Sequence, residues 1–344
     1  ADTEHPFPPR LLRGFSDLAP KNLRALSTVW PDLPALRKQG ILEDLEEITE
    51  HDTLVCFDDL AKAVITDADP LVRILAMRLL WECEDPKIVP LITDIMRDDL
   101  DEAARATAAS LLGRFVYLGE LDQVPDSIKI PLEKNLLEVV SGEDLAQVRL
   151  RALESLGYSG NAKVPELIRA AYASRDNLWV ASALCAMGRS ADDQWADLIL
   201  DKIDSGDSEI RYEAIRAAGE LELTAAMDQF FALLEEEDHE SENRLAAIWA
   251  MSQIGGSEVK EKLESLLEDA ETDEETEWIE KALENLDLNG NAENLDFFDF
   301  KPPQDSDLAG AESDDDWEED DLEDDELDDL DESLDDLDED DEEV

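Results

Sequence analysis

The sequence predicts an all-α fold in which one helical unit is stacked repeatedly along the chain, that is, an α-solenoid. Residues 208–219, SEIRYEAIRAAG, return as near-copies whose aligned positions are 72, 104, 148, 179, 210 and 243. The intervals between these positions are 32, 44, 31, 31 and 33 residues. A repeat period of 20 to 50 residues is typical of a solenoid. Apolar residues within each copy follow the i, i+3, i+4, i+7 spacing of an amphipathic helix.

Each copy places an alanine where a neighbouring helix would pack closest, and most copies end on a glycine. We expect this glycine to adopt a positive φ at the helix C-terminus, because glycine does so at low cost. The copies read Val72-Arg73…Ala76…Leu80, Ala104-Arg105…Ala108…Leu112-Gly113, Val148-Arg149…Ala152…Leu156-Gly157, Trp179-Val180…Ala183…Met187-Gly188, Ile210-Arg211…Ala214…Ala218-Gly219 and Asn243-Arg244…Ala247…Met251.

A second apolar-periodic run follows each copy after a short polar link. Pro90 and Pro165 lie near the start of their runs, where a missing N–H does little harm. The unit is therefore a two-helix hairpin of about 32 residues, a length in the usual range of helical repeats. The second runs cover residues 87–96, 163–173, 192–203, 224–234 and 257–267.

These copies resemble the HEAT-repeat family, in particular the short bacterial-type repeats with the pattern xVRxxAxxxLG that also occur in phycobilisome-lyase-like proteins. The resemblance covers roughly residues 69–286 and implies a right-handed α-solenoid of about six to eight hairpins. Two positions depart from the pattern: Val180 replaces the arginine of the fourth copy, and Ser252 replaces the glycine of the sixth. The motif is structural and implies little about function.

The charge balance is strongly acidic. There are 91 acidic and 29 basic residues, giving a net charge of −62, and residues 305–344 hold 26 acids and no Lys or Arg. Such a field disfavours nucleic acid and anionic membranes and favours basic proteins. We find neither a membrane span nor a secretion signal, and we expect a cytoplasmic protein. Cys56, Cys83 and Cys185 are expected to be buried free thiols in a reducing compartment.

Residues 1–40 form the only stretch with a positive balance. The start, His5-Pro6-Phe7-Pro8-Pro9, should be extended, and residues 18–30 should form an amphipathic helix. We interpret this region as a cap on the first repeat, which a solenoid end needs. A compatible hypothesis is that the chain's own acidic tail docks here, with Arg10, Arg13 and Arg24 as its partners.

Two further segments before residue 145 depart from the regular pattern. Residues 41–68 should form a degenerate helix pair, with His51 in its turn and with buried positions Leu42, Leu45, Ile48, Leu54, Leu60 and Val64. The 44-residue interval contains an apparent insertion at residues 117–131. This link is either a partner-contacting loop or a spacer.

Aromatic residues of the regular array mostly occupy helical core spacing. Filling between helices is the favoured interpretation over a ligand-stacking platform. Trp179 and Trp195 are the candidate exceptions, because each stands beside polar turn residues. The full set is Trp179, Trp195, Tyr212, Phe230, Phe231, Trp249 and Trp278.

The chain divides into an N-terminal extension and cap (1–40), a solenoid (41–288), an aromatic linker (289–304) and an acidic tail (305–344) whose composition predicts disorder. Phe297, Phe298 and Phe300 in the linker either cap the last repeat or dock on a partner. In the tail, Trp317 precedes leucines spaced for one helix face, and residues 317–337 should fold on a cationic surface. The alternative is a solubilising tail. The leucines are Leu322, Leu327, Leu330, Leu334 and Leu337.

No catalytic, cofactor or metal motif is recognised. His5, His51 and His239 do not share a repeat phase, and no phosphate-binding or nucleophile-elbow pattern occurs. We therefore predict a non-enzymatic scaffold whose solenoid and tail bind a partner protein of basic character. The alternatives are a lyase-like or enzyme-assisting protein, and an acidic charge that reflects adaptation to high salt.

Overall fold

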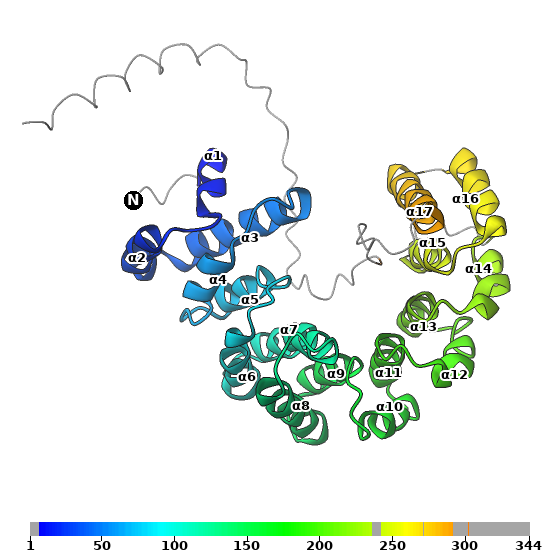
Figure 1. Ribbon diagram of the computed structural model, residues 1–344, viewed down its shortest axis with the longest axis horizontal. Helices are drawn as coiled ribbons and strands as arrows, with labels where there is room; N and C mark the ends of the chain where they lie inside the picture. Colours follow the sequence, from blue (N-terminus) through cyan, green and yellow to red (C-terminus); the bar gives the residue numbers. More distant parts are fainter. Residues whose placement is uncertain (1–6, 236–241, 271, 292–301, 303–344) are drawn as a thin grey trace, which may run out of the picture. The chain divides into compact units, whose positions relative to one another are not determined.

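The computed structural model describes residues 7–235, 242–270, 272–291 and 302. Within these residues it is all-α, with helices and short 3-10 turns and no strand. Figure 1 shows the helices following one another as antiparallel pairs in two layers. The predicted all-α solenoid is therefore confirmed.

The first layer holds the first helix of each pair, and each of its helices contacts the next one along the chain. The second layer packs against the first. The first-layer helices are α3 (Ala35–His51), α5 (Pro70–Arg78), α7 (Glu102–Glu120), α9 (Ala146–Leu156), α11 (Asn177–Arg189), α13 (Ser208–Glu220), α15 (Glu242–Ile254) and α17 (Asp273–Asn291). The second-layer helices are α4 (Asp58–Val64), α6 (Val89–Asp98), α8 (Asp126–Ser141), α10 (Val164–Tyr172), α12 (Ala196–Leu200), α14 (Met227–Leu233) and α16 (Ser257–Asp269).

All six sequence copies form first-layer helices, α5 to α15. Aspartates begin several of them, because an Asp side chain accepts a hydrogen bond from an otherwise unpaired first-turn N–H. Such N-caps are Asp69, Asp101, Asp176 and Asp207. The repeated alanines, from Ala76 to Ala247, are fully buried. Three second-layer helices are preceded by a 3-10 turn: η3 (Pro86–Ile88), η4 (Asp193–Trp195) and η5 (Thr224–Ala226).

The N-terminal region covers the first hairpin. It contains α1 (Pro9–Leu12), η1 (Arg13–Phe15), α2 (Pro20–Val29) and η2 (Trp30–Asp32). The side chains of Leu12, Leu18 and Trp30 are buried, and α1 and α2 contact α3 and α4. The segment therefore packs on the first hairpin of the array. A helix starts at Pro9, inside the stretch predicted to be extended, because proline is well accommodated in a first helical turn.

The first hairpin buries Leu42, Leu45, Leu60 and Val64 as predicted, while Ile48 is half-buried. The prediction for Leu54 was wrong, because this residue lies in the turn between α3 and α4 and is 90% exposed. His51 is the last residue of α3.

Residues 117–131 are mostly helical, so the prediction of a long link here was wrong. α7 continues to Glu120 and α8 begins at Asp126, so the extra residues lengthen both helices. The long pair is fixed to the following repeat, since Glu120 accepts a hydrogen bond from the Gly160 N–H and Glu133 accepts one from the Ser159 hydroxyl. The second of these bonds is buried. The extension is thus part of the packed array.

Two expectations about single side chains also need correction. Cys56 is exposed and lies in the turn before α4, whereas Cys83 and Cys185 are buried as predicted; all three are free thiols. Trp195 is 1% exposed, which excludes it as an open stacking platform. Its ring is core, as are those of Tyr212, Phe230 and Trp249, while Trp179, Phe231 and Trp278 are half-buried against the core.

The repeated glycine does not adopt a positive φ, contrary to the prediction. A Cβ at Gly157 would lie 2.8 Å from the Ala186 Cα, and one at Gly219 would lie 2.8 Å from the Ala250 Cα. Both contacts are to the backbone of the next first-layer helix. Glycine is therefore required because the two helices approach too closely for a side chain. In the sixth copy, Ser252 accepts a hydrogen bond from Asn285 of α17 instead.

The left-handed conformation occurs three residues after the repeated glycine. Ala191, Glu222 and Gly255 occupy this position after α11, α13 and α15, with φ of 49°, 49° and 75°. These three turns therefore use a positive φ even where the residue is not glycine, whereas Gly160, at the same position after α9, does not have one.

Replacing Gly219 by alanine should destabilise the protein by about 1 to 3 kcal/mol, because the new methyl group overpacks against backbone. Ordinarily this change stabilises a helix by roughly 0.5 to 1 kcal/mol. Gly40→Ala in α3 is the matched control, since a Cβ there has no neighbour within 4 Å. Urea midpoints should fall for Gly219→Ala and rise slightly for Gly40→Ala. Equal effects would contradict the close-approach explanation.

Candidate functional site

The helix starts of the first layer lie beside one another, and we call the row from the start of α3 to the start of α17 the N-terminal edge. A side chain near the start of each helix contacts a residue at the start of the next. We call each such contact a rung. The edge is the part of the described surface where polar and charged groups are most regularly arranged.

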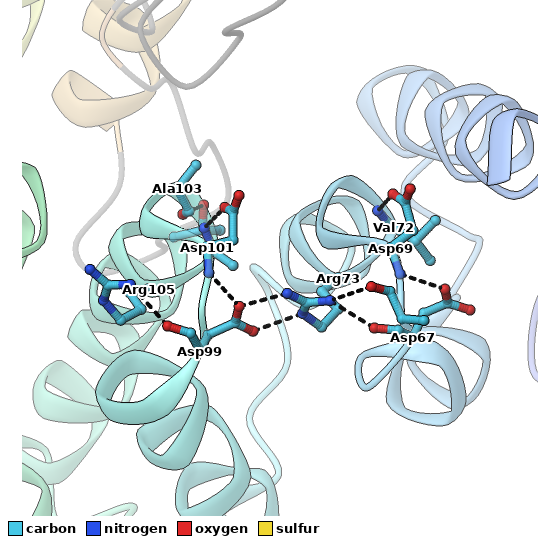
Figure 2. Close-up of polar contacts among 11 residues, drawn as sticks. Asp67, Asp69, Val72, Arg73, Asp99, Asp101, Ala103 and Arg105 are labelled. Atoms are coloured by element: carbon cyan, nitrogen blue, oxygen red, sulfur yellow. Dashed lines mark hydrogen bonds and ion pairs between the residues drawn. The ribbon is translucent and has the colours of Figure 1, made fainter.

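The first three rungs are ion pairs. Lys38 Nζ lies 2.8 Å from Asp67 Oδ2, and Arg105 Nη2 lies 2.8 Å from Asp144 Oδ1. In the middle rung, Figure 2 shows the Arg73 guanidinium with two bonds to Asp99, of 2.7 and 2.6 Å. Arg73 also donates to the Asp67 carbonyl oxygen before its own helix. Bidentate arginine–carboxylate pairs combine strength with a defined orientation. The arginine of the repeat motif therefore couples neighbouring repeats.

The contacts described for the next three rungs are of other kinds. The Arg149 guanidinium stacks over the Trp179 ring, 5.0 Å from its centroid. Val180 stands where the motif has arginine, and Asn177 makes the rung there by donating to Asp207. The rung between α13 and α15 joins Asn243 to the Ser208 hydroxyl.

The last rung is the most buried. Arg244 Nε lies 2.6 Å from Glu275 Oε1, and the two side chains are 3% and 2% exposed. Arg244 also donates to the Leu234 carbonyl oxygen. Losing either partner would leave a charge deep in the protein, which is strongly destabilising.

The aspartates of the first three rungs are stabilised in their charged form. Burial alone raises the pKa of Asp99, but hydrogen bonds from Arg73 and the Asp101 N–H outweigh it and lower the pKa below the ordinary 3.8. Asp144 has a lowered pKa for the same reason, with Arg105 and the Leu145 N–H as donors. For Asp67 the donors that outweigh burial are the Asp69 N–H, Lys38 and Trp30.

The rungs hold basic side chains inside the edge and leave carboxylates outside. Lys38, Arg73 and Arg105 have side chains only 9%, 13% and 13% exposed, all of them against carboxylates. Several exposed acids make no ion pair within the described ranges. Examples are Asp94, Glu102, Glu143, Glu166, Glu274, Glu280 and Glu284. Each rung removes one cation and one carboxylate from the surface, so the excess of acids over bases in the repeats remains exposed to solvent.

A buried polar cluster connects α9, α11 and α13. Glu154 accepts bonds from Arg151 and Ser182, and Arg216 lies between Glu213 and the Cys185 sulfur. Burial raises the pKa of the Cys185 thiol to about 12, against the lowering effect of nearby Arg189 and Arg216. This thiol is therefore protonated at neutral pH and unsuited to nucleophilic attack.

A small depression lies between α8, Arg97 of α6 and the loop that precedes α9. It has a volume of about 200 Å³ and is lined by Arg97, Asn135, Glu138, Val139, Gly142, Glu143 and Asp144. Small-molecule sites usually measure about 300 to 1,000 Å³, so this hollow suits a single side chain. Over the described residues, no three potential metal ligands are grouped.

The sequence-predicted partner-binding residues lie outside the described residues. They are Phe297, Phe298, Phe300, Trp317, Leu322, Leu327, Leu330, Leu334 and Leu337. Of the predicted tail-docking cations, Arg10 and Arg24 are exposed, while Arg13 pairs with Asp52 at 2.5 Å. The sequence analysis did not predict the rungs. The motif arginine and the aspartates before the helices were the sequence features that could have indicated them.

Comparison with known proteins agrees with this architecture. The family described as HEAT repeats matches residues 57–130 and 196–284. This chain is a HEAT-repeat protein. No curated protein matches the sequence. Within its described residues, no helix has the length and apolar character needed to cross a bilayer.

Solved structures similar to this HEAT-repeat protein include two with low identity. YibA of E. coli has 17% identity and a TM-score of 0.40, with 83% of this chain and 97% of the other covered. Human deoxyhypusine hydroxylase in complex with glycerol has 17% identity and a TM-score of 0.34, with 78% and 96% covered.

Replacing Arg73 by methionine should lower the unfolding free energy by about 3 kcal/mol, because Asp99 is left buried without its partner. Lys134→Met is the control: it removes an exposed i,i+4 ion pair with Glu138 and should change the unfolding free energy by less than about 0.5 kcal/mol. Urea unfolding followed by circular dichroism measures both. Similar small effects for the two variants would contradict a structural role of the rung.

The Asp144→Asn variant should be less stable than the parent at pH 7, and the difference should shrink at acidic pH. Because the folded pKa of Asp144 lies below 3.8, its contribution is present above that value and is lost as the pH falls through the folded pKa. Unfolding midpoints of both proteins at about pH 7 and about pH 3 test this. Asp94→Asn, at an exposed position, is the control and should match the parent. If the stability difference between the parent and Asp144→Asn is the same at both pH values, Asp144 does not have a lowered pKa in the folded protein.

Proposed function

We propose that this HEAT-repeat protein is a non-enzymatic scaffold that binds a basic partner protein through the carboxylates of its repeats and of its acidic tail. The observation that carries this proposal is the distribution of charge across the N-terminal edge. Lys38, Arg73 and Arg105 pair with carboxylates between repeats, whereas acids at helix starts such as Glu102, Glu143 and Glu274 face solvent without an ion pair in the described part. A surface of this kind attracts cationic proteins and speeds their association.

The fold supports a binding role. Stacked hairpins offer a long surface made of many similar positions, and stability comes from contacts between neighbours. The cysteine nearest to two arginines, Cys185, is buried and held in its protonated form. The depression beside α8 is small and lined by several carboxylates. These features favour recognition of side chains over chemistry on a bound substrate.

The tail supplies the second part of the proposal. Residues 305–344 contain 26 acids, and Leu322 to Leu337 repeat at helical spacing. A cationic surface would relieve the repulsion between neighbouring carboxylates and allow residues 317–337 to fold on binding. Phe297, Phe298 and Phe300 provide an adjoining apolar anchor. Without a partner, the tail would dock on Arg10, Arg13 and Arg24, all of which are exposed, and at Arg13 it would compete with Asp52.

Full-length protein should retain a defined set of basic proteins from its source cells at about 0.15 M salt and release most of them at about 0.5 M, because screening weakens exposed ion pairs. A truncation ending at Leu288 should retain fewer of them. Quantitative mass spectrometry of the retained proteins is the measurement. Retention of mainly acidic or neutral proteins, or of no protein, would refute the proposal. If the truncation retains the same proteins as the full-length chain, the tail does not contribute to binding.

A further inference from the structure

Three exposed leucines follow the N-terminal edge across consecutive repeats. Leu100 is 100% exposed, Leu145 is 52% exposed and Leu178 is 43% exposed. They stand at the starts of α7, α9 and α11, which contact each other in sequence. We call these three residues the leucine row.

Each member of the leucine row is adjacent in sequence to a residue that makes a rung. Leu100 follows Asp99, the partner of Arg73, and Leu145 follows Asp144, the partner of Arg105. Leu178 precedes Trp179, on which Arg149 stacks. The rungs therefore hold the three leucines at neighbouring positions on one edge. Contacts between repeats fix these positions.

Exposed carboxylates accompany the leucine row. Glu102 and Glu143 are exposed and make no ion pair within the described ranges, and Asp176 is exposed two residues before Leu178. Glu143 also lines the depression next to Leu145, where three carboxylates, with Glu138 and Asp144, face one cation, Arg97. Arg97 and Arg175 are the exposed cations nearest in sequence to the row, and Arg97 already lies 3.9 Å from Glu138. A ligand that covers the leucines must therefore bring positive charge beside its apolar groups.

We infer that the leucine row binds an amphipathic helix of a basic partner, with Lys or Arg beside apolar residues that repeat every seven positions. This inference rests on the proposed function and specifies the surface that carries it. Helices in contact lie about 8 to 10 Å apart, and seven residues of a helix span about 10.5 Å. The spacing of such a partner thus matches three successive helix starts, and one of its cations enters the acidic depression.

The chain's own tail is a poorer occupant of the leucine row. Its leucines have similar spacing, but Leu322 to Leu337 are embedded among aspartates and glutamates and no base occurs after residue 304. Carboxylates of the tail would meet Glu102, Glu143 and Asp176 with the same sign of charge, which disfavours docking.

A synthetic helical peptide of about 18 residues, rich in lysine and with leucine at every seventh position, is the probe. Its control is a peptide of identical composition with the leucines scrambled. Fluorescence anisotropy with the full-length protein at about 0.15 M salt measures both affinities. The periodic peptide should bind at least about tenfold more tightly, because only it aligns apolar side chains with the row.

The triple variant Leu100→Ser/Leu145→Ser/Leu178→Ser should bind both peptides equally. Leu54→Ser/Leu121→Ser is the matched control, since these leucines are 90% and 49% exposed and follow the C-terminal ends of α3 and α7, away from the row, and it should bind like the parent. A milder variant, Glu102→Gln/Glu143→Gln, should weaken binding and reduce its salt dependence without altering apolar contacts. Unchanged preference for the periodic peptide in the triple variant would overturn the inference.

Two further outcomes separate the possible failures. If both peptides bind the parent equally, the proposed affinity for basic partners stands and the leucine row is excluded. If neither binds and basic proteins are not retained either, the proposed function fails as well. If serine at the five tail leucines raises the affinity for the periodic peptide about tenfold, the tail covers the row and the partner assignment is wrong.

Discussion

The contact between neighbouring repeats at the N-terminal edge is the interaction on which the rest of this structure depends. A single hairpin has too little apolar surface to fold alone, so each repeat must be held in register with the next. The rungs fix that register at the helix starts, as Arg73 does with Asp99 and Arg244 with Glu275. Further along the same helices, Gly157 and Gly219 allow backbones to approach closely.

This coupling has an electrostatic consequence. The protein has few basic residues, and several of them are enclosed between repeats against carboxylates. Each pair removes one cation and one carboxylate from the surface, so the excess of acids stays outside and makes the array a polyanion toward solvent. Repulsion among those acids opposes folding, and a basic partner would relieve it. Stability and the proposed function are linked in this way.

The sequence alone was sufficient to predict the all-α solenoid, the six motif helices and most of their buried residues, because these depend on local periodicity. It could not predict the role of Gly219, which is set by the backbone of α15, a different helix. Residues 117–131 resembled a link because Gly119 and Pro131 are usual helix breakers, yet packing against the next repeat keeps them helical. Leu54 matched a helical pattern but lies in a turn.

The candidate site was harder to predict because its members are adjacent only across repeats. The motif arginines were recognised as a pattern, but their carboxylate partners lie 26 residues on for Arg73 and 39 residues on for Arg105. The exposed leucines had no local feature that separated them from core leucines of the same helices. The predicted tail and linker residues lie outside the described residues and stay predictions.

The most direct test of this account is the unfolding midpoint as a function of NaCl, from about 0.05 M to about 2 M. If cations are enclosed in the rungs and surplus acids face solvent, the midpoint should rise at low salt and level off by a few tenths molar, where screening is nearly complete. A midpoint that falls with salt would show that the coupling ion pairs are exposed. A rise that continues steeply through the molar range would indicate that the acidic surface serves adaptation to high salt.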